Sequence, residues 1–142
     1  MSMADSLERD LLKLIFNATA LADLAENDSS SPSTSLYVSL HTADPGDSGT
    51  QSTSETSYAA YARKAVARTT SGWTVTANSV SPVSNIVFAQ CTSGLATITH
   101  FGIGTASSGA GYLMFSGTVT SNISVLAGVS PVLTTATTIT LD

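Results

Sequence analysis

The sequence has few charged residues, and most of its polar side chains are hydroxyls. Charged residues make up 11% of the chain, against about a quarter in an average soluble protein. Ser and Thr together account for 44 residues, 23 Ser and 21 Thr. A surface made of hydroxyls is typical of β structure. It also suits burial against neighbouring molecules, because hydroxyls cost less to desolvate than Lys or Glu.

Cations are especially scarce. The formal net charge is −5, and no basic stripe that could neutralise several phosphates can be assembled from the few Lys and Arg side chains. The five cations are Arg9, Lys13, Arg63, Lys64 and Arg68. We therefore expect no direct binding of nucleic acid.

The sequence contains one cysteine, Cys91. A single cysteine excludes an intrachain disulfide, and a zinc site would have to be built from His and carboxylate ligands. We expect Cys91 to be a small buried thiol. We predict no metal site and no other cofactor.

Long apolar runs are also missing. No stretch approaches the roughly 20 apolar residues that span a bilayer. The one candidate for a signal peptide, residues 11–25, follows an acidic flank where a basic one is required, and Lys13 and Asp23 interrupt it. We therefore expect a protein that is made in the cytoplasm and does not enter a membrane.

What the sequence does contain is a series of short strand patterns. Residues 36–41 alternate apolar and polar side chains, and the turn sequence of residues 44–47 (DPGD) ends this strand. A polar stretch, residues 47–57, follows and predicts a long surface loop that is functional or mobile. The later segments predicted as strands are 58–68, 73–76, 86–89, 95–104, 112–119, 123–126 and 137–141.

These patterns predict a mainly β fold. The strands are short, turn residues separate them, and residues 78–82 are predicted as one of the turns. No helix of crossover length lies between the strands, which argues against a parallel sheet. We predict an antiparallel, jelly-roll-like β-sandwich with one core and an N-terminal amphipathic helix.

The helix is predicted over residues 5–25, with Asp5 as its cap. A polar tether, residues 27–34, would join it to the first strand, which predicts a helix-and-tether segment (1–34) and a β domain (35–142). The helix either covers an open end of its own sheets or docks on a partner, and we expect it to act as a clasp on a neighbouring molecule. The docking face comprises Leu7, Leu11, Leu14, Ile15 and Leu21.

Catalytic patterns are weak. His41 and His100 lie within strand patterns, and no partner at a recognisable spacing would make either one a base or a metal ligand. We expect a hydrogen bond on a sheet face for each, a turn for Asp44, and close packing or a bulge at the glycines of residues 102–104. We predict no enzymatic activity. Aromatic side chains that could line a sugar platform, but that core or edge packing explains better, are Tyr37, Tyr58, Tyr61, Trp73 and Tyr112.

Several of these segments together resemble a family of small structural proteins of tailed bacteriophages. The resemblance lies in residues 36–46 (LYVSLHTADPG), 58–63 (YAAYAR) and 99–104 (THFGIG), and in Trp73. The family resembled includes proteins labelled tail-fibre-like and cement (decoration) proteins that clamp a capsid shell.

The resemblance implies a non-enzymatic virion protein that is made in the host cytoplasm. Its partners would be the major capsid protein and a second copy of itself, as a homodimer. The function implied first is that of a cement protein that stabilises the capsid shell. The alternative is a tail or tail-fibre component, which would be able to contact host carbohydrate.

Overall fold

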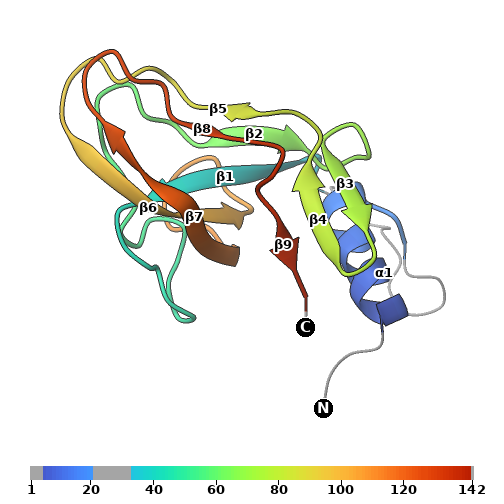
Figure 1. The fold of residues 1–142 in the computed structure, drawn as a ribbon. Helices are drawn as coiled ribbons and strands as arrows, with labels where there is room; N and C mark the ends of the chain where they lie inside the picture. The colour runs from blue at the N-terminus through green and yellow to red at the C-terminus, as the bar shows by residue number, and fades with distance from the viewer. Residues whose placement is uncertain (1–4, 21–32, 142) are drawn as a thin grey trace. The chain divides into compact units, whose positions relative to one another are not determined.

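One helix is followed by nine strands in the residues that this computed structural model describes, which are 5–20 and 33–141 (Figure 1). Side chains are described from residue 8 onward. The elements are α1 (Asp5–Asn17), β1 (Ser35–His41), β2 (Lys64–Ala67), β3 (Trp73–Thr76), β4 (Ser79–Pro82), β5 (Ile86–Val87), β6 (Ala96–Gly104), β7 (Leu113–Val125), β8 (Val132–Leu133) and β9 (Ile139–Thr140).

The strands form three sheets. Their orders are β2-β1-β6-β7, β3-β4-β9 and β5-β8. The pairs β1·β6, β3·β4, β4·β9, β5·β8 and β6·β7 are all antiparallel. A mainly β fold with antiparallel sheets and an N-terminal helix confirms the predicted fold class.

Contacts within the chain divide it into two units. Unit 1 consists of Met1–Ser35, Val66–Asn85 and Thr134–Asp142, and unit 2 consists of Leu36–Ala65 and Ile86–Leu133. The helix thus groups with a sheet that comes later in the sequence. The predicted boundary between residues 34 and 35 separates parts that would fold independently. Contacts within the folded chain do not measure independent folding, so this boundary stays a prediction.

In unit 1 the helix packs on the three-stranded sheet, where it contacts β3 and β4 (Figure 1). Leu12 and Phe16 are fully buried on the sheet side of the helix, together with Trp73 and Val80 of the strands. The rings of Phe16 and Trp73 meet edge to face, with their centroids 4.8 Å apart. This small core holds the helix against its own chain.

The helix ends earlier than predicted, at Asn17. Ala18 has a φ of 53°, which is left-handed and stops the helix. The guanidinium of Arg68 donates to the carbonyl oxygens of Leu14 (2.5 Å) and Ile15 (2.5 Å) in the last turn, and its burial lowers the pKa of Arg68. The helix was predicted to reach residue 25 from the spacing of apolar residues alone. The part of this prediction that covers residues 21–25 lies outside the described residues.

In unit 2 the strands β1 and β6 pair so that Val38 faces Ile103 and Leu40 faces Phe101. These side chains are buried and form the apolar face of the four-stranded sheet. The alternation predicted for residues 36–41 is therefore confirmed. The buried apolar residues of unit 2 are Leu36, Val38, Leu40, Tyr58, Ile86, Phe88, Cys91, Ile98, Phe101, Ile103, Val125 and Leu133.

Three strand predictions differ from the structure. Of residues 58–68, only Lys64–Ala67 form a strand, and residues 58–63 belong to the loop that precedes this strand. Ser79–Pro82, predicted as a turn, is strand β4, which pairs with both β3 and β9. The two strands predicted over residues 112–126 are one long strand, β7. For Ser79–Pro82, cross-strand pairing with β3 and β9 overrides the local turn preference of Ser and Asn.

Candidate functional site

The second face of β1 and β6 is polar, and it lies buried beneath the long loop that joins β1 to β2, the β1–β2 loop (residues 42–63). Ser39 and His41 on this face are both 0% exposed. Ser39 Oγ lies 2.8 Å from His41 Nε2, and His41 Nδ1 lies 2.8 Å from the carbonyl oxygen of Thr53 in the loop. A carbonyl oxygen can only accept, so Nδ1 carries the proton and Nε2 accepts from the Ser39 hydroxyl.

Burial favours the neutral form of His41. Burial lowers the pKa of His41, because the charged ring would lose its hydration. His100 forms a hydrogen bond with its neighbour, with 2.8 Å between Nδ1 and Thr99 Oγ1. Both histidines thus make the sheet-face hydrogen bonds that the sequence predicted.

Gln51 joins the β1–β2 loop to the loop between β6 and β7, the β6–β7 loop (residues 105–112). Its side chain is fully buried, and its Nε2 donates to the carbonyl oxygen of Tyr37 at 3.2 Å. Its Oε1 accepts from the backbone N–H of Ala106 at 2.9 Å. The backbone N–H of Gln51 donates to the carbonyl oxygen of Ala110 at 2.8 Å. One amide side chain therefore connects two loops and a strand.

Two glycines of β6 leave room for these polar side chains. A Cβ added at Gly102 would lie 2.8 Å from His41 Nε2 and from Ser39 Oγ. A Cβ added at Gly104 would overlap the side chain of Gln51. Close packing is therefore the reason for the glycines of residues 102–104, as the sequence predicted.

The third connection is an ion pair between Arg63, which is buried, and Glu55, which is half-buried. The Arg63 Nε and Nη2 atoms each lie 2.7 Å from one oxygen of the Glu55 carboxylate, which is a bidentate pair. The same guanidinium donates to the carbonyl oxygens of Ala106 (2.9 Å) and Gly109 (2.6 Å) in the β6–β7 loop. The hydrogen bond with Glu55 raises the pKa of Arg63.

Tyr61 ties this ion pair to strand β1. Its hydroxyl donates to Glu55 Oε1 at 2.8 Å and accepts from the backbone N–H of Leu40 at 3.0 Å. Burial raises the pKa of Tyr61 well above its ordinary value, so the hydroxyl keeps its proton as a donor. The β1–β2 loop, predicted as functional or mobile, is thus held to the sheet by buried polar contacts.

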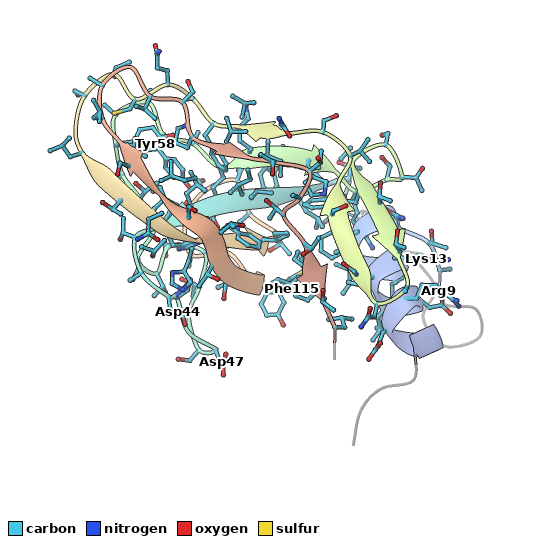
Figure 2. All side chains as sticks on the ribbon, viewed as in Figure 1. Arg9, Lys13, Asp44, Asp47, Tyr58 and Phe115 are labelled. Carbon is cyan, nitrogen blue, oxygen red and sulfur yellow. The ribbon has the colours of Figure 1, made fainter. Side chains whose placement is uncertain are left out.

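The outer part of this loop is a tight turn. Asp44 Oδ1 accepts from the backbone N–H of Gly46 at 2.9 Å, and Gly46 has a φ of 70°. A turn explains Asp44 without a bound ion, as predicted. Figure 2 shows Asp44 and Asp47 on this loop, projecting away from the sheet.

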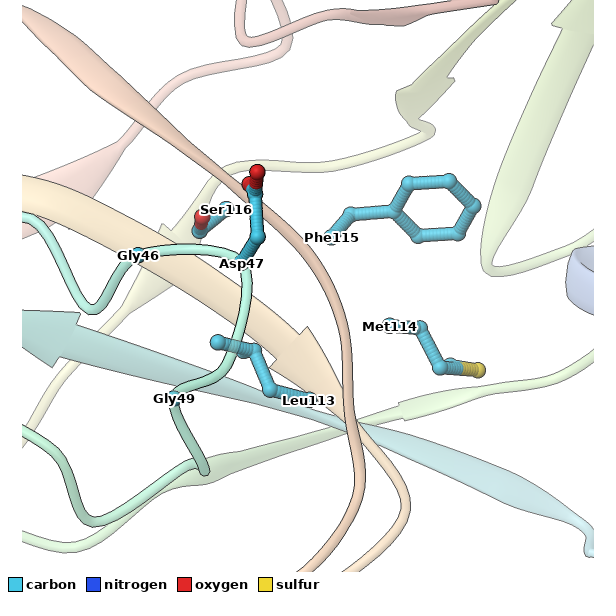
Figure 3. A pocket seen from close by; sticks show the side chains of 7 residues that line it. All are labelled: Gly46, Asp47, Gly49, Leu113, Met114, Phe115 and Ser116. Atoms are coloured by element: carbon cyan, nitrogen blue, oxygen red, sulfur yellow. The ribbon is translucent and has the colours of Figure 1, made fainter.

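An open cleft of about 300 Å³ lies between the turn and the first residues of β7 (Figure 3). Leu113 and Ser116 lie on the side of β7 that faces the loop, whereas Phe115 projects from the other side of the strand. The pairing of β6 with β7 shifts register here, because Ile103 of β6 pairs with Phe115 and Gly104 pairs with Leu113, and the extra residue in β7 accounts for the broken alternation. The lining residues are Gly46, Asp47, Gly49, Leu113, Met114, Phe115 and Ser116.

The cleft beside the turn offers few groups for acid–base chemistry. Asp47 is its one titratable lining residue, so the cleft lacks an acid–base pair. A second opening, of about 240 Å³, is lined by Glu55 and Arg63, which are already bound to each other. No group of three metal-ligating side chains occurs in the described part of the chain.

The residues of the predicted docking face are only partly described. Leu11, Leu14 and Ile15 lie on α1 and are half-buried. The side chain of Leu7 and the whole of Leu21 lie outside the described residues. The face that the helix buries in unit 1 instead contains Leu12 and Phe16, which the sequence prediction did not name. The role of the other face as a clasp stays a prediction.

The aromatic side chains divide between core and surface. Trp73 and Tyr58 are buried, which confirms core packing for these two, and Tyr37 is half-buried. The rings of Tyr58 and Tyr61 meet edge to face at 5.4 Å. Tyr112 is 69% exposed.

Sequence reasoning missed the buried roles of Gln51, Glu55 and Arg63. A polar residue in a Ser- and Thr-rich loop is indistinguishable from a solvated one until its partners are known. The sequence contains no signal for these three residues, but it does contain one for the surface: it has no Asp, Glu, Lys or Arg from Thr69 to Leu141. A long stretch of folded surface without charge is unusual for a protein that stays alone in solution.

No described helix has the length and apolar character needed to cross a membrane. The fold is that of a β-rich protein in which buried polar contacts fix the β1–β2 and β6–β7 loops, and its strands from β3 onward contain no Asp, Glu, Lys or Arg. The family described as podophage GP4 fiber I protein gp80 matches residues 2–141. The chain belongs to this family, and it is therefore a phage structural protein. No match was found among curated proteins.

Proposed function

We propose that this protein is a subunit of a podophage tail fibre and acts by binding other virion chains. The observation that carries the proposal is the family match over residues 2–141, since that family is described as a fibre protein. We place the protein in the virion, after synthesis in the host cytoplasm. The resemblance implied a cement protein first and a tail-fibre component as the alternative. We now propose the fibre subunit first and keep the cement protein as the alternative.

The described surface supports a binding role. The β1–β2 and β6–β7 loops are fixed by buried polar contacts, so a partner would meet a preformed surface and little ordering entropy would be lost on binding. The clefts are open, and the charged pair beside one of them is already satisfied. A non-enzymatic role is part of the proposal.

The cement function remains the second candidate, supported by the half-buried apolar residues Leu11, Leu14 and Ile15 on the helix. A clasp that inserts such residues into a shell subunit would suit a decoration protein, whose partner would be the major capsid protein. A fibre subunit would use the same residues on a neighbouring fibre chain.

Copy number separates the two functions. We would purify virions and quantify this protein against the major capsid protein by mass spectrometry with isotope-labelled peptides. A fibre subunit should be present in a few to tens of copies, and gold-labelled antibodies should mark the tail. A ratio close to one copy per capsid subunit, with label over the whole head, would replace the fibre proposal by the cement function.

A further inference from the structure

Strand β7 forms a long, uncharged edge of the four-stranded sheet. It contains 13 residues, Leu113–Val125, and in the described part of the chain β6 is its only hydrogen-bonded neighbour. An edge strand presents unpaired backbone N–H and C=O groups to its surroundings. Natural proteins usually protect such an edge with Lys, Pro or β-bulges; the β7 sequence, LMFSGTVTSNISV, contains neither Lys nor Pro, and its pairing with β6 shifts register at two places, one of them between Thr118 and Ile123.

Large apolar side chains are exposed beyond the two ends of this strand. Tyr112 is 69% exposed and precedes β7, whereas Leu126 is 49% exposed and follows it. Leu95 lies beside Leu126, because Ala96 pairs with Val125, and it is 85% exposed. An edge with apolar groups at both ends has the composition of an interface.

We propose that β7 pairs with β7 of a second copy of this chain, antiparallel and about a two-fold axis near Val119. Tyr112 and Leu126 are each seven residues from Val119 (119 − 112 and 126 − 119). The two-fold axis therefore places Tyr112 of each copy near Leu126 of the other, and both exposed side chains become buried. This is the isologous arrangement that closed dimers use.

The charge distribution permits a second copy as the partner at this edge. The chain has a net charge of −5, so copies repel each other at most of their surfaces. Nine of its ten Asp and Glu residues come before Thr56, and the tenth is Asp142. The edge of β7 lies within the stretch without charge, so two copies can meet there without bringing like charges together.

The inference gives a partner to the proposed fibre subunit, but it rests on the strand edge and can be tested without virions. Sedimentation equilibrium of the full-length chain should show a dimer in exchange with monomer. The double variant Thr118→Lys and Thr120→Lys, at two exposed positions of β7, places four ammonium groups together in the dimer. We expect it to weaken dimerisation at least about tenfold.

The matched control is Thr138→Lys, which adds the same side chain at an exposed position outside the four-stranded sheet. This variant should dimerise as the parent chain does. A parent chain that stays monomeric at high concentration would overturn the inference, and so would a folded double variant that dimerises with unchanged affinity.

Single cysteines test the geometry even if the Lys variant does not fold. We would introduce Cys separately at Ser116, Thr118, Thr120 and Ser124, all exposed on β7, and leave the buried Cys91 in place. Two-fold antiparallel pairing predicts that oxidative cross-linking between copies is strongest at Thr118→Cys or Thr120→Cys and falls toward both ends. Equal cross-linking at all four positions, a maximum at either end, or none at all would overturn the inference.

Failure of this test and failure of the proposed function are distinguishable. The oligomeric state is measured on the purified chain, whereas the fibre role is decided by copy number in virions. A monomer present in a few copies on the tail would leave the fibre proposal standing without this dimer.

Discussion

At the scale of single residues, the polar layer beneath the β1–β2 loop depends on complete hydrogen bonding. Removing one partner of a buried polar pair leaves the other unsatisfied, which costs more than the pair itself contributes. The Arg63 guanidinium makes four of these hydrogen bonds, two with Glu55 and one with each of two carbonyl oxygens of the β6–β7 loop.

Arg63→Ala should therefore destabilise the protein strongly. We expect the free energy of unfolding to fall by about 2–4 kcal/mol, less than for a fully buried ion pair, because Glu55 is half-buried and borders an opening. The measurement is urea denaturation followed by tryptophan fluorescence and circular dichroism. The paired variant Arg63→Met with Glu55→Gln should recover part of the loss, since no buried charge is left alone. If the urea midpoint of Arg63→Ala equals that of the parent chain, the contacts of the Arg63 guanidinium do not stabilise the fold.

His41 predicts a specific dependence of stability on pH. The pKa of His41 is lowered in the folded protein by burial, while in the unfolded chain it is about 6.5. The unfolded state therefore binds more protons below this pH, and the free energy of unfolding should decrease as the pH falls from about 6.5 toward the folded-state pKa.

The measurement is the urea midpoint at a series of pH values between about 7.5 and about 5.5, above the range where most carboxylates titrate. His41→Gln keeps a donor and an acceptor but does not titrate, so its midpoint should change less over this range. His100→Gln, which removes the other histidine, is the comparison variant. Equal slopes in all three proteins would refute the assignment to His41.

At the scale of secondary-structure elements, the N-terminal helix has two different faces. Leu12 and Phe16 are 0% exposed in unit 1, whereas Leu11, Leu14 and Ile15 are half-buried. A helix can thus be held by its own sheet and still present apolar groups to a partner. The predicted clasp and the observed packing use different residues, so each can be tested separately.

Leu12→Ala should destabilise the folded chain by about 2–5 kcal/mol, because a fully buried leucine leaves a cavity. Leu11→Ala, the same change on the half-buried face, should cost much less. The urea midpoints of both variants give the comparison. Equal costs would mean that the helix is held by both faces and that no separate clasp face exists.

The clasp itself is tested by Leu11→Asp with Ile15→Asp. We expect the double variant to lower incorporation into assembled virions, since two charges would lie on the docking face. Normal incorporation of a stable, folded double variant would show the clasp prediction to be wrong.

At the scale of the whole molecule, charge is distributed unevenly along the sequence. All five cations and nine of the ten acids come before Thr69. The remaining surface consists of hydroxyl, amide and apolar groups, which can be buried against another chain at low cost. This distribution favours assembly through the later part of the sequence.

Dimerisation through an uncharged edge should depend weakly on salt. The Debye length falls from about 30 Å at 0.01 M salt to about 3 Å at 1 M. Screening should relieve only the general repulsion of the negative copies, so the dimer should become slightly tighter as salt increases. Sedimentation at several salt concentrations gives the dissociation constant. A dimer that weakens steeply with salt would indicate an interface held by ion pairs instead.

The sequence by itself determined the fold class and the first strand. Strict alternation in residues 36–41 reflects one apolar and one buried polar face, and that period is a local property of the chain. Cys91 as a buried thiol, hydrogen bonds for both histidines and close packing at residues 102–104 were also predicted, because residue type indicates each of them even where the partner is a distant residue.

The tertiary structure alone decided where the helix ends, which of its faces is buried and how the long loop is fixed. Arg68 reaches the last turn of α1 from a distant part of the sequence, and Gln51 and Arg63 bind the β6–β7 loop, which the pairing of β1 with β6 brings near them. These contacts join residues far apart in sequence, and polar side chains carry no periodic pattern that would announce them. A buried polar side chain is defined by its partners, and the fold supplies those partners.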